Sequence, residues 1–282
     1  MGQAMKHYTL PDGKVQICFS GGRTSGYMLH KILEANGGLP DRAKVVFANT
    51  GREMPETLDF VQECSDRWNV PIVWLEYNRR AGKVTYDIVS HNSAARNGEP
   101  FTTLTDSTGI LPNIYRRFCT SQLKVLTAKR YLVKQGWKQW TQCLGIRGDE
   151  RRRVKKSTDK RWENWYPLND ANVSKRDVMA FWQAQPFDLQ LANINGSTPL
   201  GNCDGCFLKS EANRAALARD YPERFKWWAD LERNKTKKLG VRSAFDADQT
   251  YEQLGNFVSR QGDWLFDDEA FLCQASDGEC TG

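Results

Sequence analysis

The stretch VQICFSGGRTSGYML, residues 15–29, constrains the fold of this 282-residue chain more than any other segment. An apolar run leads into a turn of small residues and then into apolar residues at helical spacing. This is the pattern of a strand, a glycine loop and a helix. Backbone N–H groups at the start of such a helix favour an anion, and glycines let a phosphate or sulfate approach the chain. On Ser20-Gly21-Gly22 alone, an anion-binding loop and an ordinary tight turn are both open interpretations.

Short β-rich runs alternate with helical patterns through the first half of the chain, which predicts an α/β fold with a doubly wound, mostly parallel sheet. Residues 90–113 are polar and loop-like, and we interpret them as a mobile or substrate-facing segment. We expect a main domain over residues 1–200 and a helical C-terminal extension over residues 201–282 that packs on it. The predicted strands lie at 14–19, 44–49, 71–76 and 139–146, and the predicted helices at 24–35, 55–68, 115–135, 174–184 and 210–234.

Hydropathy favours a cytoplasmic protein with no membrane contact. No window approaches 18 uncharged apolar residues, and the first residues carry no apolar stretch of signal-peptide length. The eight cysteines are widely spread, so we interpret them as reduced thiols or metal ligands and not as a disulfide framework.

Basic residues gather between Arg147 and Arg161, although the net charge of the whole chain is only +6. Such a segment is either a solvated basic face or a site for an anionic partner, with nucleic acid as one candidate. Arg147 directly follows a predicted strand, where ligands bind in open α/β sheets, so we favour a functional role for it.

Four stretches together resemble the phosphoadenosine phosphosulfate (PAPS) reductase family, within the adenine nucleotide α-hydrolase superfamily that also contains the PP-loop ATP pyrophosphatases. SGGRTS (20–25) resembles the family's PP-loop, and FANTGREMPETLDFV (47–61) resembles its second-strand motif. LGIRGDERRR (144–153) and WYPLND with SKRDV (165–178) resemble its fourth-strand segment and the helix after it. The resemblance spans residues 14 to about 210.

The resemblance implies an adenine nucleotide as ligand, either PAPS, adenosine phosphosulfate (APS) or ATP. Arg147 and Asp149 are the implied catalytic residues beside the nucleotide. The implied nucleotide-binding residues are Ser20, Gly21, Gly22, Arg23, Thr24, Ser25, Asn49, Thr50, Gly51, Arg147, Gly148 and Arg151.

Thr24 departs from the pattern of the ATP pyrophosphatases, which carry an aspartate at this loop position to help hold Mg²⁺. A hydroxyl brings no charge to the metal, so a nucleotide that arrives already activated is favoured over self-catalysed adenylation. Asp149 and Glu150 are alternative carboxylates for Mg²⁺, or they simply balance the neighbouring arginines.

Cys203-Asp-Gly-Cys206 forms a CxxC motif, and Cys119 precedes it by a separation that resembles the sulfonucleotide reductases with a four-iron cluster. The resemblance implies a 4Fe-4S cluster held by Cys119, Cys203 and Cys206, with one iron open. A structural zinc half-site or three ordinary thiols are the alternatives.

The chain ends DGECTG, and Glu279-Cys280 resembles the Glu-Cys-Gly tail of the assimilatory reductases, whose cysteine attacks the sulfonucleotide. We therefore take Cys280 as a candidate nucleophile, with an accidental terminal cysteine as the alternative.

Three functions remain open at this stage. The leading hypothesis is a reductase that binds a sulfonucleotide and releases sulfite with the help of a thioredoxin-like donor. The second is an ATP-dependent sulfur transferase that resembles tRNA or DNA thiolation enzymes, and the third is a nucleotide-binding module without catalysis. A homo-oligomer is compatible with all three.

Overall fold

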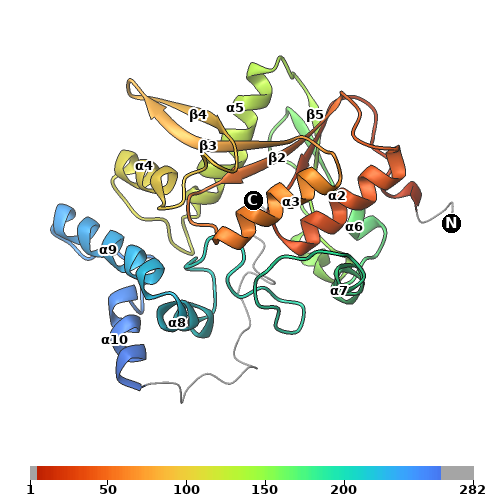
Figure 1. The fold of residues 1–282 in the computed structure, drawn as a ribbon. Coiled ribbons are helices and arrows are strands. Elements are labelled where there is room, and N and C mark those ends of the chain that lie inside the picture. The colour runs from red at the N-terminus through yellow and green to blue at the C-terminus, as the bar shows by residue number, and fades with distance from the viewer. Residues whose placement is uncertain (1–4, 262–282) are drawn as a thin grey trace.

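The fold is built on a six-stranded sheet with the order β4-β3-β2-β1-β5-β6 (Figure 1), in a computed structural model that describes residues 5–261. Neighbouring strands run parallel, except that β3 and β4 form an antiparallel pair at one edge. The predicted α/β fold with a mostly parallel sheet is therefore confirmed. The strands are β1 (Val15–Cys18), β2 (Ala43–Asn49), β3 (Ile72–Arg80), β4 (Lys83–Val89), β5 (Trp140–Cys143) and β6 (Trp162–Trp165).

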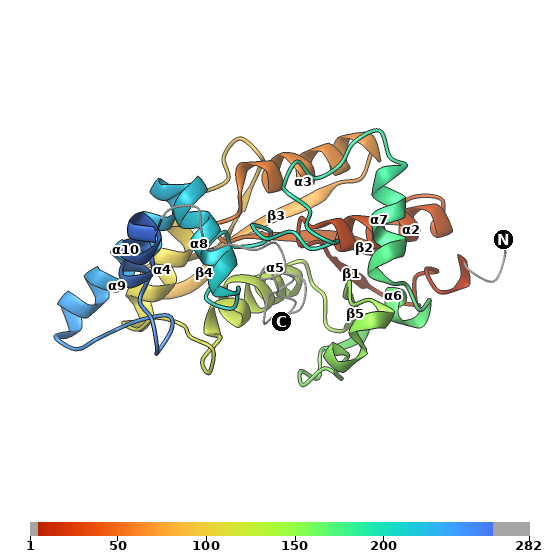
Figure 2. The ribbon, with the colours of Figure 1, turned by 90° about the horizontal axis from the view of Figure 1, so that it is seen from below.

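Helices cover both faces of this sheet (Figure 2). Helices α2 (Arg23–Asn36), α3 (Pro55–Arg67) and α7 (Lys175–Gln183) lie on one face, and α5 (Leu126–Lys134) lies on the other. Side chains alternate along each strand, so Val45 and Phe47 enter the core under the first group of helices, while Val46 enters the core under α5. Both faces of β2 are thus buried, as expected for a central parallel strand.

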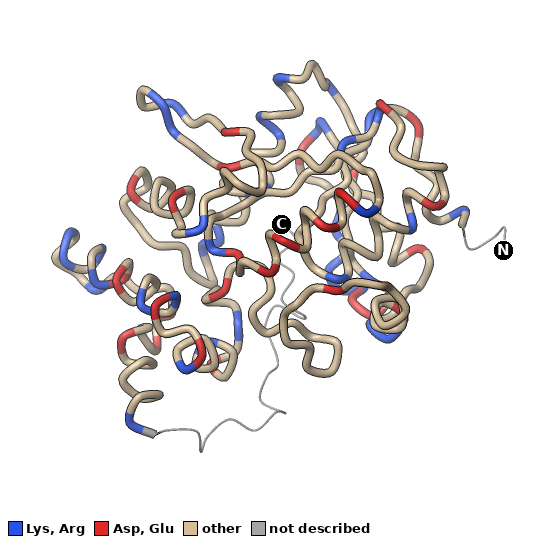
Figure 3. The backbone as a smooth tube through the Cα atoms, viewed as in Figure 1, with Lys and Arg blue, Asp and Glu red and all other residues tan. Residues whose placement is uncertain are grey.

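The C-terminal helices α8 (Glu211–Asp220), α9 (Pro222–Leu239) and α10 (Tyr251–Gln261) form a second core together with α4 (Glu99–Thr108). Phe101 of α4 packs edge-on against Trp228 of α9, and both rings are buried. Helix α9 carries both basic and acidic residues (Figure 3), and pairs such as Lys226 and Asp230 lie one turn apart. The last helices are therefore anchored through a segment of the first half of the chain.

Three short elements complete the fold near the carboxyl ends of the strands. A π-helical turn, η1 (Thr120–Val125), runs into α5, and a 3₁₀ segment, η2 (Gly148–Arg153), follows β5. A single turn, α6 (Pro167–Asp170), precedes α7.

One prediction is wrong and the bounds of another change. Residues 90–113 contain α4, and the helix predicted over 115–135 becomes helical only from residue 118 and then passes through η1. Helix α4 escaped prediction because its buried face, with Phe101 and Leu104, finds its partners on α9 and beyond, more than a hundred residues away in the sequence. Strands β4 and β6, both at sheet edges, were also not predicted.

Within residues 5–261, the structure contains no helix with the length and apolar character required to cross a membrane.

Candidate functional site

The first glycine loop connects β1 to α2, and no side chain caps the start of this helix within residues 5–261. Gly22 is the N-cap residue in an extended conformation and contributes no side chain, so the first N–H groups of α2 point out of the helix end. Gly21 has φ +78°, and a Cβ built there would lie 2.7 Å from Thr57 Cγ2. Only glycine fits at this position, and the loop is held close against α3.

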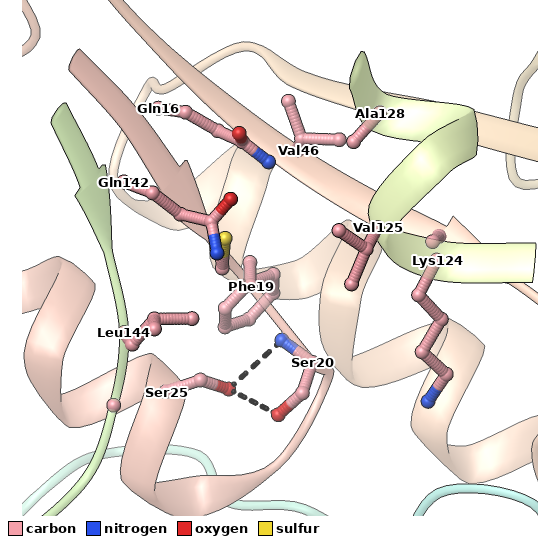
Figure 4. A pocket seen from close by; sticks show the side chains of 13 residues that line it. Gln16, Phe19, Ser20, Ser25, Val46, Lys124, Val125, Ala128, Gln142 and Leu144 are labelled. Atoms are coloured by element: carbon pink, nitrogen blue, oxygen red, sulfur yellow. Dashed lines mark hydrogen bonds between the residues drawn. The ribbon is translucent and has the colours of Figure 1, made fainter. Parts of the chain in front are cut away.

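Two serines stabilise the loop through hydrogen bonds inside it (Figure 4). Ser25 Oγ accepts a hydrogen bond from the backbone N–H of Ser20 at 3.2 Å and lies 2.9 Å from Ser20 Oγ. Ser25 Oγ also donates to the carbonyl of Gly22 at 2.9 Å. The conformation is therefore set before any ligand arrives.

The side chain of Arg23 contacts other parts of the protein and does not point toward a ligand. Its guanidinium forms two hydrogen bonds of 2.8 Å to the carboxylate of Asp188 and bonds Thr198 Oγ1 at 3.0 Å. The side chain is buried and ties α2 to the segment after α7. Because the side chain is engaged, Arg23 would bind a nucleotide through its backbone N–H. This role stays a prediction.

Thr24 and Arg147 meet beside the loop in a small cavity that Lys175 and Asn202 also line, which we call the arginine cavity. Arg147 Nη1 donates to Thr24 Oγ1 at 3.2 Å, and Arg147 Nε donates to Asp149 Oδ1 at 2.9 Å. Asn202 has φ +55°, and its buried Oδ1 has no hydrogen-bond partner among residues 5–261. The cavity thus combines a helix N-terminus with two basic side chains, the setting that favours an anion.

Arg147 is only 2% exposed, so its guanidinium is not open to solvent at the strand end where the sequence favours a functional role for it. Asp149 and Glu150 both lie within ion-pair distance of it, at 2.9 and 3.4 Å. The sequence leaves open whether these carboxylates hold Mg²⁺ or balance the charge of neighbouring arginines. Their contacts in the structure are those of charge balance.

The other two nucleotide-binding residues predicted in this segment differ in exposure, since Gly148 is buried and Arg151 is exposed. A Cβ at Gly148 would approach Asn172 Oδ1 to 2.8 Å, which explains a glycine there. Arg151 is exposed and donates to the same Asn172 oxygen at 3.0 Å. Most basic side chains up to Arg161 are exposed as well, so an interaction with nucleic acid along this segment stays a prediction.

The second predicted loop, at the carboxyl end of β2, is held by its own side chains. Asn49 Nδ2 donates to Glu76 Oε1 at 2.6 Å, and Thr50 Oγ1 lies 2.8 Å from Glu53 Oε2. Burial raises the pKa of Glu76, which the hydrogen bonds from Ala95 and Asn49 partly offset. Gly51 has φ +78°. The side chains of Asn49 and Thr50 hold the loop in its conformation. Because these side chains are engaged, a ligand would contact the backbone of the loop.

A pocket lies between the carboxyl ends of β1, β2 and β5 and the start of α5; we call it the strand-end pocket (Figure 4). Ser20 and Ser25 of the glycine loop stand at one side, Val46 and Val125 form apolar walls, and Lys124 lies at the rim near Ser20. This is the edge of the sheet at which open α/β folds bind their ligands.

Three cysteines line a separate small cavity, which we call the thiol cavity. Cys119 comes from the start of the helix that contains η1, whereas Cys203 and Cys206 come from the loop before α8. Thr50 Oγ1 lies 3.3 Å from Cys203 Sγ, so this cavity adjoins the second predicted loop. Lys124 lines both the thiol cavity and the strand-end pocket. It lies in η1, and π-helical turns are frequent at functional sites.

The cysteine loop is held in place by a buried carboxylate. Asp204 is fully buried and accepts hydrogen bonds from Arg52 Nη2 at 2.6 Å, Arg224 Nε at 2.6 Å and Trp228 Nε1 at 2.8 Å. The backbone N–H of Asp204 donates to the carbonyl of Arg52 at 2.8 Å. The CxxC segment is therefore fixed against the loop that follows β2.

The thiol donor set suits a soft metal or an iron-sulfur cluster in its chemistry. In the part of the chain from residue 5 to 261, however, no group of three or more His, Cys, Asp or Glu side chains is arranged to hold a metal ion. The three predicted ligands thus border one cavity without forming a ready metal site, and we derive no step through a metal.

The other described cysteines belong to the core. Burial raises the pKa of Cys18, which lines the strand-end pocket, to about 12, and it raises the pKa values of Cys64 and Cys143 as well. These thiols stay protonated and are poor nucleophiles. Cys280, the predicted tail nucleophile, lies outside the described residues.

Among the residues that line these cavities, sequence reasoning missed five with an amide or an ammonium group. A signal was present for two of them, because a glutamine interrupts each of the buried strands VQIC and WTQC, where parallel strands are normally apolar. The other three lie in loops or helices whose positions follow from tertiary contacts. The five are Gln16, Lys124, Gln142, Lys175 and Asn202.

Comparison with protein families identifies the class. Residues 14–189 match the phosphoadenosine phosphosulfate reductase domain, which is more than half of the chain. The chain therefore belongs to this family, as its motifs predicted.

A curated relative is the uncharacterized nin region protein ORF290 of Escherichia phage lambda. The two sequences are 30% identical over 211 residues, which covers 72% of this chain and 69% of the phage protein.

Solved structures show weaker likeness. The phosphoadenylyl-sulfate reductase of Candida auris in a phosphate complex has a TM-score of 0.43 and 16% identity, covering 66% of this chain and 81% of that one. The U34-tRNA thiolase NcsA of Methanococcus maripaludis with its [4Fe-4S] cluster has a TM-score of 0.38 and 12% identity, covering 92% and 77%. At these values we draw no conclusion from either.

Proposed function

We propose that this protein binds an adenine sulfonucleotide and reduces its sulfur to sulfite by thiol chemistry. The observation that carries the proposal is the position of Lys124, which lines both the strand-end pocket and the thiol cavity. A nucleotide in the first cavity would have its sulfate or phosphate near this ammonium, next to a cavity lined by three thiols. Membership of the PAPS reductase family supports the same assignment.

Binding would use groups that the fold holds ready. The N–H groups at the start of α2 and the cation of Lys124 would neutralise the anionic part of the nucleotide. The arginine cavity, with Arg147 and Lys175, offers a second place for a phosphate group. Thr24 supports a substrate that is already activated, because it presents a hydroxyl toward Arg147 and no carboxylate for Mg²⁺.

The proposed chemistry needs two thiols and no external oxidant. A cysteine thiolate attacks the sulfur of the sulfonucleotide, and the adenosine phosphate leaves with the electron pair of the S–O bond. A second thiolate then attacks the cysteine Sγ of the S-sulfocysteine, a disulfide forms, and sulfite leaves with the electron pair of the S–S bond. A thioredoxin-like dithiol would reduce the disulfide for the next cycle.

The proposal is tested by sulfite release from PAPS and from APS under reducing conditions. The variants Cys119→Ser, Cys203→Ser, Cys206→Ser and Cys280→Ser are assayed side by side. We expect the rate of sulfite release to fall by at least about a hundredfold in the variant that lacks the attacking thiol and in the variant that lacks the resolving thiol. Cys64→Ala is the matched control, since Cys64 is buried in the core away from the cavities. Nucleotide binding with no sulfite release from the unsubstituted protein would favour the non-catalytic module and reject the reductase.

A second candidate is an ATP-dependent sulfur transferase. The convergence of Cys119, Cys203 and Cys206 on one cavity favours it, because three thiolates suit the chemistry of a cluster with one open iron. Pyrophosphate release from ATP, together with iron and sulfide in anaerobically purified protein, is the expected result for this function. Colourless, iron-free protein that leaves ATP intact would reject it.

A further inference from the structure

Two glutamines lie in the wall of the strand-end pocket, at positions where a buried parallel strand normally carries apolar side chains. Gln16 of β1 and Gln142 of β5 are direct partners in the register of the parallel pair, so their side chains lie on the same face of the sheet. They are 4% and 6% exposed. Figure 4 shows both carboxamides extending into the pocket.

Neither carboxamide has a hydrogen-bond partner among residues 5–261, in contrast to Asn49, whose amide is fully engaged with Glu76 and Ala95. The two side chains reach the pocket instead of a protein partner, and packing alone would be served better by leucine or valine. Two such amides side by side, both reaching into one cavity, are a feature that a ligand would satisfy.

The rest of the pocket suits a flat heteroaromatic group. Val46, Val125 and Ala128 form an apolar wall across the pocket from the two glutamines, so a ring could lie along this wall with its polar edge toward the two amides. Ser20 stands at the end near the glycine loop, where the phosphates of a nucleotide would be held. The polarity of the cavity thus matches a nucleotide with its base at the carboxamides.

We infer that Gln16 and Gln142 select the base of the bound nucleotide by pairing with the amino edge of adenine, an inference that rests on the proposed function. Each carboxamide offers one acceptor and one NH₂ donor. The 6-amino group of adenine carries two hydrogens and lies between the acceptors N1 and N7. Two carboxamides can therefore accept from the amino group and donate to both ring nitrogens.

Guanine fits the pair less well. It places an oxygen at position 6 beside N7, so two neighbouring acceptors face the second carboxamide and leave its oxygen without a donor. The protein would therefore discriminate against guanine, because in the guanine complex the oxygen of the second carboxamide stays buried without a hydrogen-bond donor.

The test compares nucleotide binding by calorimetry in the full chain. The probes are ATP and adenosine 3′,5′-bisphosphate, each measured against its guanine counterpart, and the triphosphate of purine riboside, which lacks the 6-amino group. Gln16→Leu and Gln142→Leu keep the side-chain size and remove the hydrogen bonds. Gln183→Leu, at an exposed position of α7, is the matched control.

We expect the unsubstituted protein and Gln183→Leu to prefer adenine over guanine by about tenfold or more, and each pocket variant to lose about tenfold in affinity for ATP. The purine riboside nucleotide should bind the unsubstituted protein more weakly than ATP, and this difference should shrink in each single variant and vanish in the double variant Gln16→Leu/Gln142→Leu. This convergence is specific to a contact with the amino group.

Two results would overturn the inference, and they differ in what they say about the proposed function. If adenine nucleotides bind and the double variant Gln16→Leu/Gln142→Leu keeps the full preference, the base is selected elsewhere and the proposed function stands. If no nucleotide of either base binds the unsubstituted protein, the proposed function fails and the inference fails with it. Should the variants not fold, as judged by circular dichroism, equal affinity of the unsubstituted protein for ATP and the purine riboside nucleotide would by itself reject the inference.

Discussion

Arg52 and Asp204 form a buried ion pair, with Nη2 and Oδ2 2.6 Å apart and side chains that are 3% and 0% exposed. Residue 52 follows the second strand, whereas residue 204 lies between the two cysteines of the CxxC motif. The pair therefore joins the edge of the sheet to the thiol cavity.

Replacement of Asp204 by asparagine should destabilise the protein by about 3 to 5 kcal/mol, because it leaves the guanidinium of Arg52 buried without its counter-charge. The measurement is urea unfolding followed by tryptophan fluorescence. Asp230→Asn is the control, since Asp230 pairs with Lys226 at the surface of α9 and its loss should cost less than about 1 kcal/mol. Equal effects of the two substitutions would contradict the anchoring role of Asp204.

Gly21→Ala should destabilise the protein more than Gly13→Ala. Both glycines have φ near +80°, so alanine is strained at either position by about 1 to 2 kcal/mol. At Gly13 nothing lies within 4 Å of the new Cβ, whereas at Gly21 it would meet Thr57 Cγ2 at 2.7 Å. The contact should add about 1 to 3 kcal/mol at Gly21, as measured by thermal unfolding. A difference near zero would show that the loop can move away from α3.

Lys124→Met should lower kcat/KM for sulfite release by about tenfold to a hundredfold, because Lys124 lines both the strand-end pocket and the thiol cavity and its charge-assisted contacts with the substrate would be lost. Lys129→Met is the control, since Lys129 of α5 forms an ion pair with Asp159 and lines neither cavity. Initial-rate kinetics with PAPS measure both. Unchanged kinetics in Lys124→Met would argue that the anion binds only in the arginine cavity.

Glu232 should make the stability of the protein depend on pH. Burial raises its pKa from 4.5 to about 7, although backbone N–H groups of Phe245 and Tyr251 and the cations of Arg214 and Arg242 act in the opposite direction. The folded state therefore binds a proton that the unfolded state has lost between these two pH values. Its stabilising contribution is complete below about pH 4.5 and falls by roughly 3 kcal/mol as the pH rises through 7.

Glu232→Gln tests this by the slope of the unfolding free energy between pH 4.5 and 7, which should become flatter than in the unsubstituted protein. The absolute stability also falls, because the new NH₂ group faces a backbone N–H, and for this reason the slope is the quantity to compare. Glu223→Gln, at an exposed position of α9, should keep the original slope. A variant Glu232→Gln with that same slope would assign the pH dependence to other groups.

The sequence by itself determined the elements whose signal is local. Alternation of apolar strands and amphipathic helices predicted β1, β2, β3 and the helices beside them, and the run from Ser20 to Ser25 located the glycine loop. These features depend on residues within a few positions of each other, since a glycine that must adopt a positive φ or an apolar run that must be buried is visible in any short window.

Only the tertiary structure decided which side chains share a cavity. It placed Gln16 next to Gln142 because β1 and β5 are neighbours in a sheet whose order does not follow the chain, and it placed Lys124 on both cavities through a π-helical turn that interrupts a regular helical pattern. It also turned Arg23 and Arg147, which the sequence presents as candidate ligands for an anion, into buried partners of Asp188 and Asp149. The identity of a cation or an amide can be predicted from the sequence, but its partner is set by distance in three dimensions, and that distance depends on the packing of the whole chain.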